Sequence, residues 1–314
     1  MTPTPITISD SQSGACAKIL PGIGFNCVSF VVPSAGGPLE VLWTAPEFLA
    51  GEGKPSHSGI PILFPFTGRI SGTEFEFEGK RFPLSAGDGR GNAIHGFALN
   101  RPWRLVEQAS DRLVGALQAS VDDPAILNHW PADFRITAAY QVSGSTLACD
   151  FTVENPDSKP LPFALGTHPY FRLPLGGASA ADCRVTVPVE YGWELESLLP
   201  TGRTTSPPVV GELSRGMPFG EMKLDNVFGG LTFENHHCTT TIHDPASGRT
   251  MTMTFDDQFT TCVVYNPPHR EAVCIEPYTT VPDPFRLRAM KIDPHLQVLP
   301  PGGLFRTRIE MRIS

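Results

Sequence analysis

The sequence has no excess of positive charge. Its 314 residues carry 24 Lys and Arg against 32 Asp and Glu, a formal net charge of −8. Binding to nucleic acid or to an anionic membrane surface depends on Lys and Arg that displace counterions. We therefore expect no nucleic-acid partner and no membrane partner, and a small molecule recognised by local contacts fits the chain better.

A long apolar run and a secretory leader are also missing. No stretch approaches the roughly 20 apolar residues that span a bilayer, and the polar segment Met1 to Gly14 has no basic region followed by an apolar one. The cysteines are odd in number and free of any C-x-x-C pair, which is typical of buried thiols in a reducing compartment. They are Cys16, Cys27, Cys149, Cys183, Cys238, Cys262 and Cys274. We expect a cytoplasmic protein.

Long helices have little room, because 32 prolines and 30 glycines are spread along the chain. Short segments with a two-residue period lie between them. Thr73 to Leu84 alternates Phe and Glu and turns at Gly79, which predicts a hairpin. A second hairpin is predicted for Phe134 to Val153, with its turn at Ser143-Gly144-Ser145. Further strands are predicted at Val185 to Val189, Thr239 to His243, Thr250 to Phe255 and Phe305 to Ile313.

Helix is favoured only in two short segments, Pro124 to Trp130 and Phe285 to Lys291. Many short strands with turn signals and no βαβ alternation are typical of an all-β protein. The chain shows no internal repeat and no linker-like shift in composition. We therefore predict one large antiparallel β-sandwich domain over residues 1–314.

Several familiar site signatures are absent as well. Gly87 to Asn92 is rich in glycine but lacks the GxGxxG spacing, and no helix follows it. The segment therefore indicates neither a dinucleotide-binding motif nor a P-loop. His236-His237 has no HExxH or paired CxxC context that would support a metal site. No G-x-S-x-G elbow is present. We predict no metal and no cofactor.

Two segments do carry chemistry. Gly166-Thr167-His168-Pro169-Tyr170-Phe171 sets one imidazole between an apolar segment and a proline. In Ala272 to Asp283, an apolar strand leads to Glu276, directly before a proline that we expect to end the strand. Together they resemble the catalytic motifs of the aldose 1-epimerase, or galactose mutarotase, family. That resemblance implies a galactose mutarotase-like supersandwich with Glu276 as catalytic base and His168 as catalytic acid.

Three further segments extend the resemblance from about residue 60 to the end of the chain. Phe64-Pro65-Phe66-Thr67-Gly68-Arg69-Ile70 matches a family element that usually reads Asn-Arg-Ile, so Gly68 removes one expected polar contact. His95 lies in Asn92 to Phe97, and Asp225 lies in Leu224-Asp225-Asn226-Val227-Phe228. The resemblance implies that Arg69, His95 and Asp225 bind sugar hydroxyls, while Phe97 or Trp103 offers an apolar face.

The implied reaction is cofactor-independent mutarotation of a hexose by a monomer or homodimer. Unperturbed pKa values of about 4.3 for Glu and 6.5 for His suggest an ionised Glu276 that accepts the O1 proton and a protonated His168 that donates to O5.

Three alternatives stay open. His95-Gly96-Phe97 through Trp103 also resembles hexose-6-phosphate epimerases, in which Arg90, Arg101 or Arg172 would hold the phosphate. A non-catalytic carbohydrate-binding sandwich would use the same fold. A glycoside hydrolase would pair Glu276 with Asp283 or Asp225.

Overall fold

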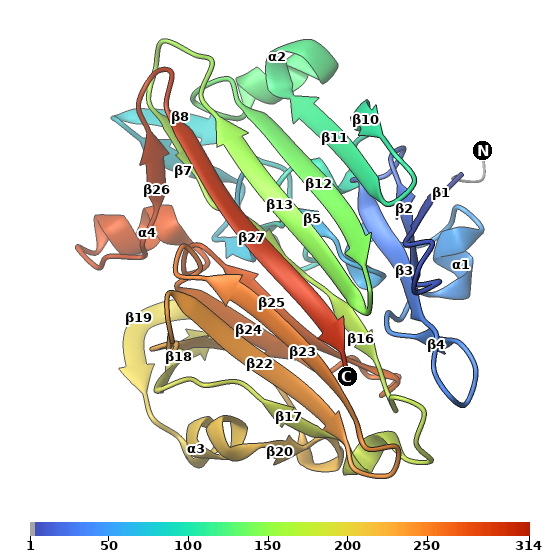
Figure 1. The fold of residues 1–314 in the computed structure, drawn as a ribbon. Coiled ribbons are helices and arrows are strands. Elements are labelled where there is room, and N and C mark those ends of the chain that lie inside the picture. The colour runs from blue at the N-terminus through green and yellow to red at the C-terminus, as the bar shows by residue number, and fades with distance from the viewer. Residues whose placement is uncertain (1–3) are drawn as a thin grey trace.

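Two large antiparallel β-sheets form the centre of the fold, as Figure 1 shows for the computed structural model. The structure describes residues 4–314, so the first three residues of the polar segment Met1 to Gly14 lie outside it. The nine-stranded sheet has the order β10 (Arg104–Gln108), β11 (Arg112–Gln118), β12 (Arg135–Ser143), β13 (Thr146–Glu154), β27 (Leu304–Ile313), β23 (Arg249–Asp256), β22 (His237–Asp244), β17 (Arg184–Thr186) and β20 (Met217–Pro218).

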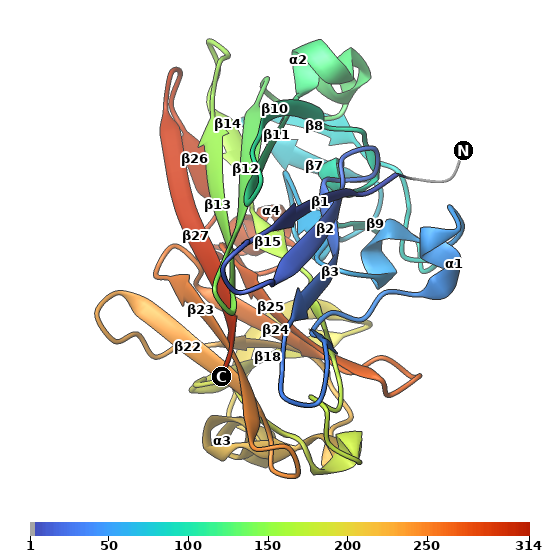
Figure 2. The same cartoon turned by 45° about the vertical axis from the view of Figure 1, so that its right-hand side comes forward.

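The second large sheet carries the elements that matter for function. Its order is β19 (Leu199–Thr205), β18 (Tyr191–Glu196), β21 (Asp225–Gly229), β24 (Thr261–Tyr265), β25 (Ala272–Tyr278), β15 (Gly166–Thr167) and β5 (Ile62–Leu63), and β16 (Tyr170–Arg172) also pairs with β25. In Figure 2, which is turned by 45°, β24, β25 and β18 form a layer separate from β22 and β23 of the nine-stranded sheet. The predicted antiparallel β-sandwich is therefore confirmed.

Smaller elements surround the two sheets. A four-stranded meander is formed by β1 (Ile6–Ser9), β2 (Cys16–Leu20), β3 (Asn26–Val32) and β4 (Leu39–Glu40). Two-stranded pairs join β6 (Arg69–Ile70) to β9 (Ala93–Ile94), β7 (Glu74–Phe77) to β8 (Lys80–Pro83), and β14 (Leu161–Phe163) to β26 (Gln297–Leu299). The α-helices are α1 (Pro46–Leu49), α2 (Ala119–Asp122), α3 (Pro208–Arg215) and α4 (Pro284–Ala289), and 3-10 turns cover Pro55–His57, Ala98–Asn100, Pro124–Asn128, Ala180–Asp182 and Phe219–Glu221. Within residues 4–314, no helix combines the length and the apolar character that crossing a membrane demands.

The predicted strands agree well with these elements. In β27 the alternate residues from Phe305 to Ile313 are buried, and β12 and β13 pair as the predicted hairpin. The strand predicted for Val185 to Val189 is shorter, because the Val187 amide bonds to the Leu213 carbonyl of α3 instead of continuing the ladder. The helix predicted at Pro124 is a 3-10 turn that ends at Asn128, and α3 was not predicted at all.

One hydrophobic cluster fills the space between the sheets and includes residues from Ile8 to Ile313. Phe151 of β13 and Ile309 of β27 belong to it together with Val264 of β24 and Ile275 of β25. All seven cysteines are free thiols, and all but Cys16 are buried, as the sequence predicted.

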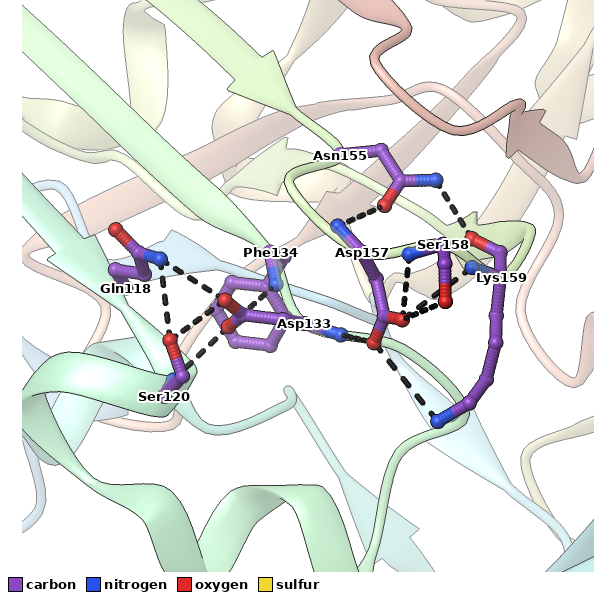
Figure 3. A network of polar contacts seen from close by, with 8 residues as sticks. All are labelled: Gln118, Ser120, Asp133, Phe134, Asn155, Asp157, Ser158 and Lys159. Carbon is purple, nitrogen blue, oxygen red and sulfur yellow. Dashed lines mark hydrogen bonds and ion pairs between the residues drawn. The ribbon is translucent and has the colours of Figure 1, made fainter.

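Asp133 ties the connections at one end of the nine-stranded sheet together (Figure 3). Its carboxylate accepts hydrogen bonds from the Ser120 hydroxyl at 2.6 Å and the Gln118 amide at 2.9 Å. Its own backbone N–H donates to Asp157 at 2.8 Å. These contacts hold α2, the start of β12 and the connection after β13 together, because a buried carboxylate requires several donors.

Two glycines with the same backbone angle provide a test of packing at the site's edge. Gly96 and Gly79 both have φ +73°, but a Cβ at Gly96 would lie 2.2 Å from the Phe64 carbonyl oxygen, whereas a Cβ at Gly79 would meet nothing within 4 Å. We expect Gly79→Ala to cost about 1–3 kcal/mol of stability from the left-handed backbone alone, and Gly96→Ala to cost clearly more. Urea unfolding of both variants measures the difference, and equal losses would contradict the packing argument.

Candidate active site

His168 lies between β15 and β16, opposite Glu276 of β25. Gly166 pairs with Tyr278, and Tyr170 pairs with Cys274. His168 lies midway between Gly166 and Tyr170, and Glu276 lies midway between Tyr278 and Cys274. The same antiparallel register therefore places His168 opposite Glu276. The His168 amide bonds to the Pro61 carbonyl at 3.0 Å, so this residue leaves the ladder between β15 and β16 while its side chain stays over β25.

The two side chains touch. His168 Nε2 lies 3.2 Å from Glu276 Oε1, and the two residues are only 7% and 2% exposed. The proline after Glu276 does not end the strand as we expected: Pro277 lies inside β25, which continues to Tyr278. Its missing N–H is tolerated because the strand pairing carries on at Tyr278, which is matched to both Gly166 and Thr261.

Two tyrosines complete this pair, and neither was singled out from the sequence. The Tyr278 hydroxyl donates to Glu276 Oε2 at 2.5 Å. The Tyr170 ring stacks on the His168 ring with centroids 4.8 Å apart and planes 7° apart. Both segments read X-Pro-Tyr, and a strand places residues i and i+2 on one face. This repeated spacing was the signal that could have identified both tyrosines.

Burial sets the protonation of the pair. It raises the pKa of the Glu276 carboxyl well above its usual range, against the opposing effect of the Tyr278 hydrogen bond. Burial also lowers the pKa of the His168 imidazole to about 3. The free site therefore favours a carboxylic acid and a neutral imidazole. This differs from the ionised Glu276 and protonated His168 expected from unperturbed values, because desolvation penalises both charges.

All five residues that the sequence proposed for the site line one cavity of about 210 Å³: Arg69, His95, His168, Asp225 and Glu276. They come from five separate parts of the chain. The volume lies below the roughly 300–1,000 Å³ typical of pockets for drug-sized ligands. The cavity is therefore suited to one compact molecule.

Arg69 is held by a loop whose role we did not predict. Its Nε donates to Asp88 Oδ2 at 3.1 Å. Desolvation would raise the pKa of Asp88, but hydrogen bonds from Asn92, the Arg90 amide and Arg69 outweigh it and hold the pKa at about 2. The glycine-rich segment from Gly87 to Asn92 is thus organised around a carboxylate that orients Arg69, and the lining residues Gly87 and Asp88 bring it to the cavity.

His95 and Asp225 supply further polar atoms. His95 has φ +65°, and its ring packs edge-on against His168 at 5.7 Å. Burial lowers its pKa well below the usual value, so the neutral ring can both donate and accept. Burial raises the pKa of Asp225, and no donor among residues 4–314 forms a hydrogen bond to its carboxylate.

Some of the expected contacts do not reach the cavity. Trp103 is buried and stacks on Phe25 at 5.5 Å, and Phe97 packs against Phe66 at 5.9 Å. Neither ring lines the cavity, and Trp103 has the core position that its sequence context also allows. Arg101 is paired with Asp123, and the Arg172 Nε donates to the Leu42 carbonyl. Neither they nor Arg90 line the cavity.

Asp283 has a structural position. Its carboxylate accepts from the Ser71 amide at 3.1 Å and from Arg286, and its own N–H donates to the Arg69 carbonyl at 2.8 Å. It therefore supports the strand that carries Arg69 and does not line the cavity.

One group of metal-ligand type occurs within residues 4–314. Atoms of His168, Cys274 and Glu276 lie within 4.8 Å of one another. Ligands around zinc at 2.0–2.3 Å lie roughly 3.5–4 Å apart. Within this group, His168 and Glu276 contact each other directly at 3.2 Å.

Comparisons with known proteins identify the family of this chain and match its fold. The aldose 1-epimerase family model matches residues 6–312. A galactose mutarotase-like protein from Clostridium acetobutylicum superposes with a TM-score of 0.85 at 21% identity, covering 96% of this chain and 93% of that one. An aldose epimerase homologue from C. elegans gives 0.79 at 18% identity and 99% of both chains. At these identities the solved structures show the fold.

Curated relatives match over a shorter span. The Escherichia coli protein YphB is 27% identical over 150 residues, which cover 45% of this chain and 48% of that protein. The plasmid-encoded LacX of Lactococcus lactis is 27% identical over 139 residues, which cover 44% of this chain and 42% of LacX. The chain thus spans about half the length of the curated relatives it matches.

The lowered pKa of His168 makes stability depend on pH. The unfolded chain takes up the imidazole proton near pH 6.5, whereas the folded protein does so only near pH 3. Unfolding is therefore favoured as pH falls through this window. We expect thermal melts to show a loss of Tm on acidification that is smaller in His168→Asn. The exposed His237→Asn serves as control, and identical pH slopes in all three proteins would contradict the burial of a neutral imidazole.

Proposed function

The chain belongs to the aldose 1-epimerase family, and from that premise we propose that it interconverts the α and β anomers of a hexose by acid/base ring opening and closure. The observation that carries the proposal is the buried contact between His168 and Glu276 in the wall of a cavity of about 210 Å³. We propose further that residues 1–314 act as one domain, which the hydrophobic cluster from Ile8 to Ile313 supports.

The reaction needs one acid and one base. A proton leaves O1, a proton reaches the ring oxygen O5, and the C1–O5 bond breaks. The freed aldehyde rotates, and the ring closes on its other face with the two roles exchanged. We assign Glu276 as the acceptor of the O1 proton and His168 as the donor to O5.

The assigned roles require the charged form of the pair, which the free site disfavours. One proton moving from Glu276 Oε1 to His168 Nε2, atoms 3.2 Å apart, converts one form into the other. The pair is neutral overall in both forms, so no external counter-ion has to be buried. Sugar hydroxyls that bond to the carboxylate favour its ionised form.

Arg69, His95 and Asp225 hold the sugar in this proposal. Arg69 presents guanidinium donors fixed by Asp88, and Asp225 offers acceptor oxygens that hydroxyl groups can reach. Because a misplaced ring oxygen wastes the acid, such contacts raise the rate by orientation as well as by binding.

Replacement of either reacting group tests the mechanism. Polarimetry of fresh α-glucose and α-galactose should show accelerated equilibration that falls about 10²–10⁴-fold in Glu276→Gln and in His168→Asn. The exposed pair Glu234→Gln and His237→Asn should keep the wild-type rate. A wild-type rate in Glu276→Gln or His168→Asn would remove that residue from the mechanism.

A hexose-6-phosphate is the second candidate substrate, and it is favoured by the Lys54 ammonium at the cavity. His57 lies beside it, with a pKa that burial and Lys54 lower, and can donate a hydrogen bond as a neutral imidazole. No carboxylate of residues 4–314 forms an ion pair with Lys54. A phosphate on the far end of the sugar would supply the missing charge. Here Lys54 and His57 replace Arg90, Arg101 and Arg172 as the proposed phosphate contacts.

Comparing glucose with glucose 6-phosphate decides between the two substrates. If the phosphate is bound, Lys54→Gln should raise KM for glucose 6-phosphate about tenfold and leave KM for glucose unchanged. The exposed Lys80→Gln is the matched control. Efficient turnover of glucose together with no turnover of glucose 6-phosphate would end the phosphorylated candidate.

The two other readings have weaker support. A glycoside hydrolase that pairs Glu276 with Asp283 does not fit the position of Asp283. Its carboxylate accepts a hydrogen bond from the Ser71 amide and forms an ion pair with Arg286. A non-catalytic sugar-binding sandwich does not explain why His168 and Glu276 are buried in contact with each other. Sugar binding without faster equilibration would favour it.

A further inference from the structure

We propose that Tyr278 is a positioning residue for this reaction, that it fixes which carboxylate oxygen of Glu276 faces His168, and that the bare backbone of Gly166 makes room for it. The inference rests on the proposed epimerase function. It concerns a residue that holds the base and is not itself an acid or a base in the reaction.

The contacts divide the two oxygens of Glu276 between two partners. Oε2 accepts the Tyr278 hydroxyl at 2.5 Å, while Oε1 lies 3.2 Å from His168 Nε2. Tyr278 is 1% exposed and Glu276 is 2% exposed, so water does not replace the hydroxyl. With Oε2 occupied, Oε1 is the oxygen left to exchange a proton, and the plane of the carboxylate is set.

The position of the tyrosine ring depends on the glycine opposite it. A Cβ on Gly166 would lie 2.4 Å from Tyr278 Cδ1 and 3.0 Å from Cε1, and 2.8 Å from Thr67 Cγ2. Gly166 is the residue paired with Tyr278 across the ladder, so the ring lies over bare backbone. A Cβ on Gly68 would lie 3.7 Å from Tyr278 Cε2 and 2.8 Å from Pro282 Cγ. The Gly68 distance to the ring is an ordinary van der Waals contact, whereas a methyl group at Gly166 would press on the tyrosine ring and on the Thr67 methyl group.

The hydrogen bond also acts on the basicity of Glu276. A donor to the ionised carboxylate stabilises that form, so Tyr278 lowers the pKa that burial has raised. The other charged and titratable groups around Glu276 are unchanged when only the hydroxyl is removed. They are Arg69 of β6, His168 and Tyr170 beside β25, Asp225 of β21, Cys262 and Tyr265 of β24 and Cys274 of β25 itself.

Tyr278→Phe removes the hydroxyl and keeps the ring. We expect kcat for mutarotation to fall about 10–100-fold, the range for losing a hydrogen bond to a charged group, with KM little changed. The limb of the pH–rate profile that reports ionisation of Glu276 should move to higher pH. The matched control is Tyr191→Phe, a half-buried tyrosine packed against the same small hydrophobic cluster.

Gly166→Ala tests the space for the ring without removing any polar atom. We expect it to lower kcat in the same direction as Tyr278→Phe. The double variant should lose little more than the worse single one, because both changes break one contact. Full additivity would show that Gly166 acts elsewhere and would overturn its part in the proposal.

The outcomes separate this inference from the proposed function. A wild-type protein that does not speed equilibration would refute the function. A wild-type protein that does, together with a Tyr278→Phe variant of unchanged kcat and unchanged pH profile, would refute the positioning role alone. If Gly166→Ala fails to fold, the Tyr278→Phe result still decides that role.

Discussion

The candidate active site depends on the pairing of β25 with the broken strand formed by β15 and β16. The ladder contacts at Gly166–Tyr278 and Tyr170–Cys274 hold the two segments in register. A shift by one residue would turn Glu276 and Tyr278 to the other face of the sheet. The register itself therefore decides whether an imidazole and a carboxylate meet, and the rest of the sandwich fixes that register by burying both faces of β25.

Burial of this pair is possible because neither group carries a charge in the free site. A carboxylic acid beside a neutral imidazole leaves no charge to desolvate, and the Tyr278 hydroxyl donates to Oε2 of Glu276. The aromatic stack of Tyr170 on His168 adds contact area that fixes the ring plane. The same low dielectric that disfavours separated charges would strengthen hydrogen bonds to a bound sugar.

Carboxylates elsewhere in the fold have a different use. Asp88 orients Arg69, and Asp283 bonds to the backbone on both sides of that strand. Asp133 joins connections far along the sheet. Each accepts hydrogen bonds from neighbouring groups, whereas no protein donor within residues 4–314 bonds to the carboxylate of Asp225.

The sequence by itself determined several strands of the sandwich and the five candidate residues, because a two-residue burial period and short motifs are local properties. Residues close together in the sequence were enough to predict the strand over residues 305–313, the hairpin at Gly79 and the joint motifs around His168 and Glu276. The sequence did not predict the protonation of the His168–Glu276 pair or the continuation of β25 through Pro277. It also did not predict the roles of Tyr278, Asp88 and Asp283. Each depends on burial or on partners that lie far away in the chain, and only the tertiary structure decides which distant atoms exclude water from a side chain or donate to it.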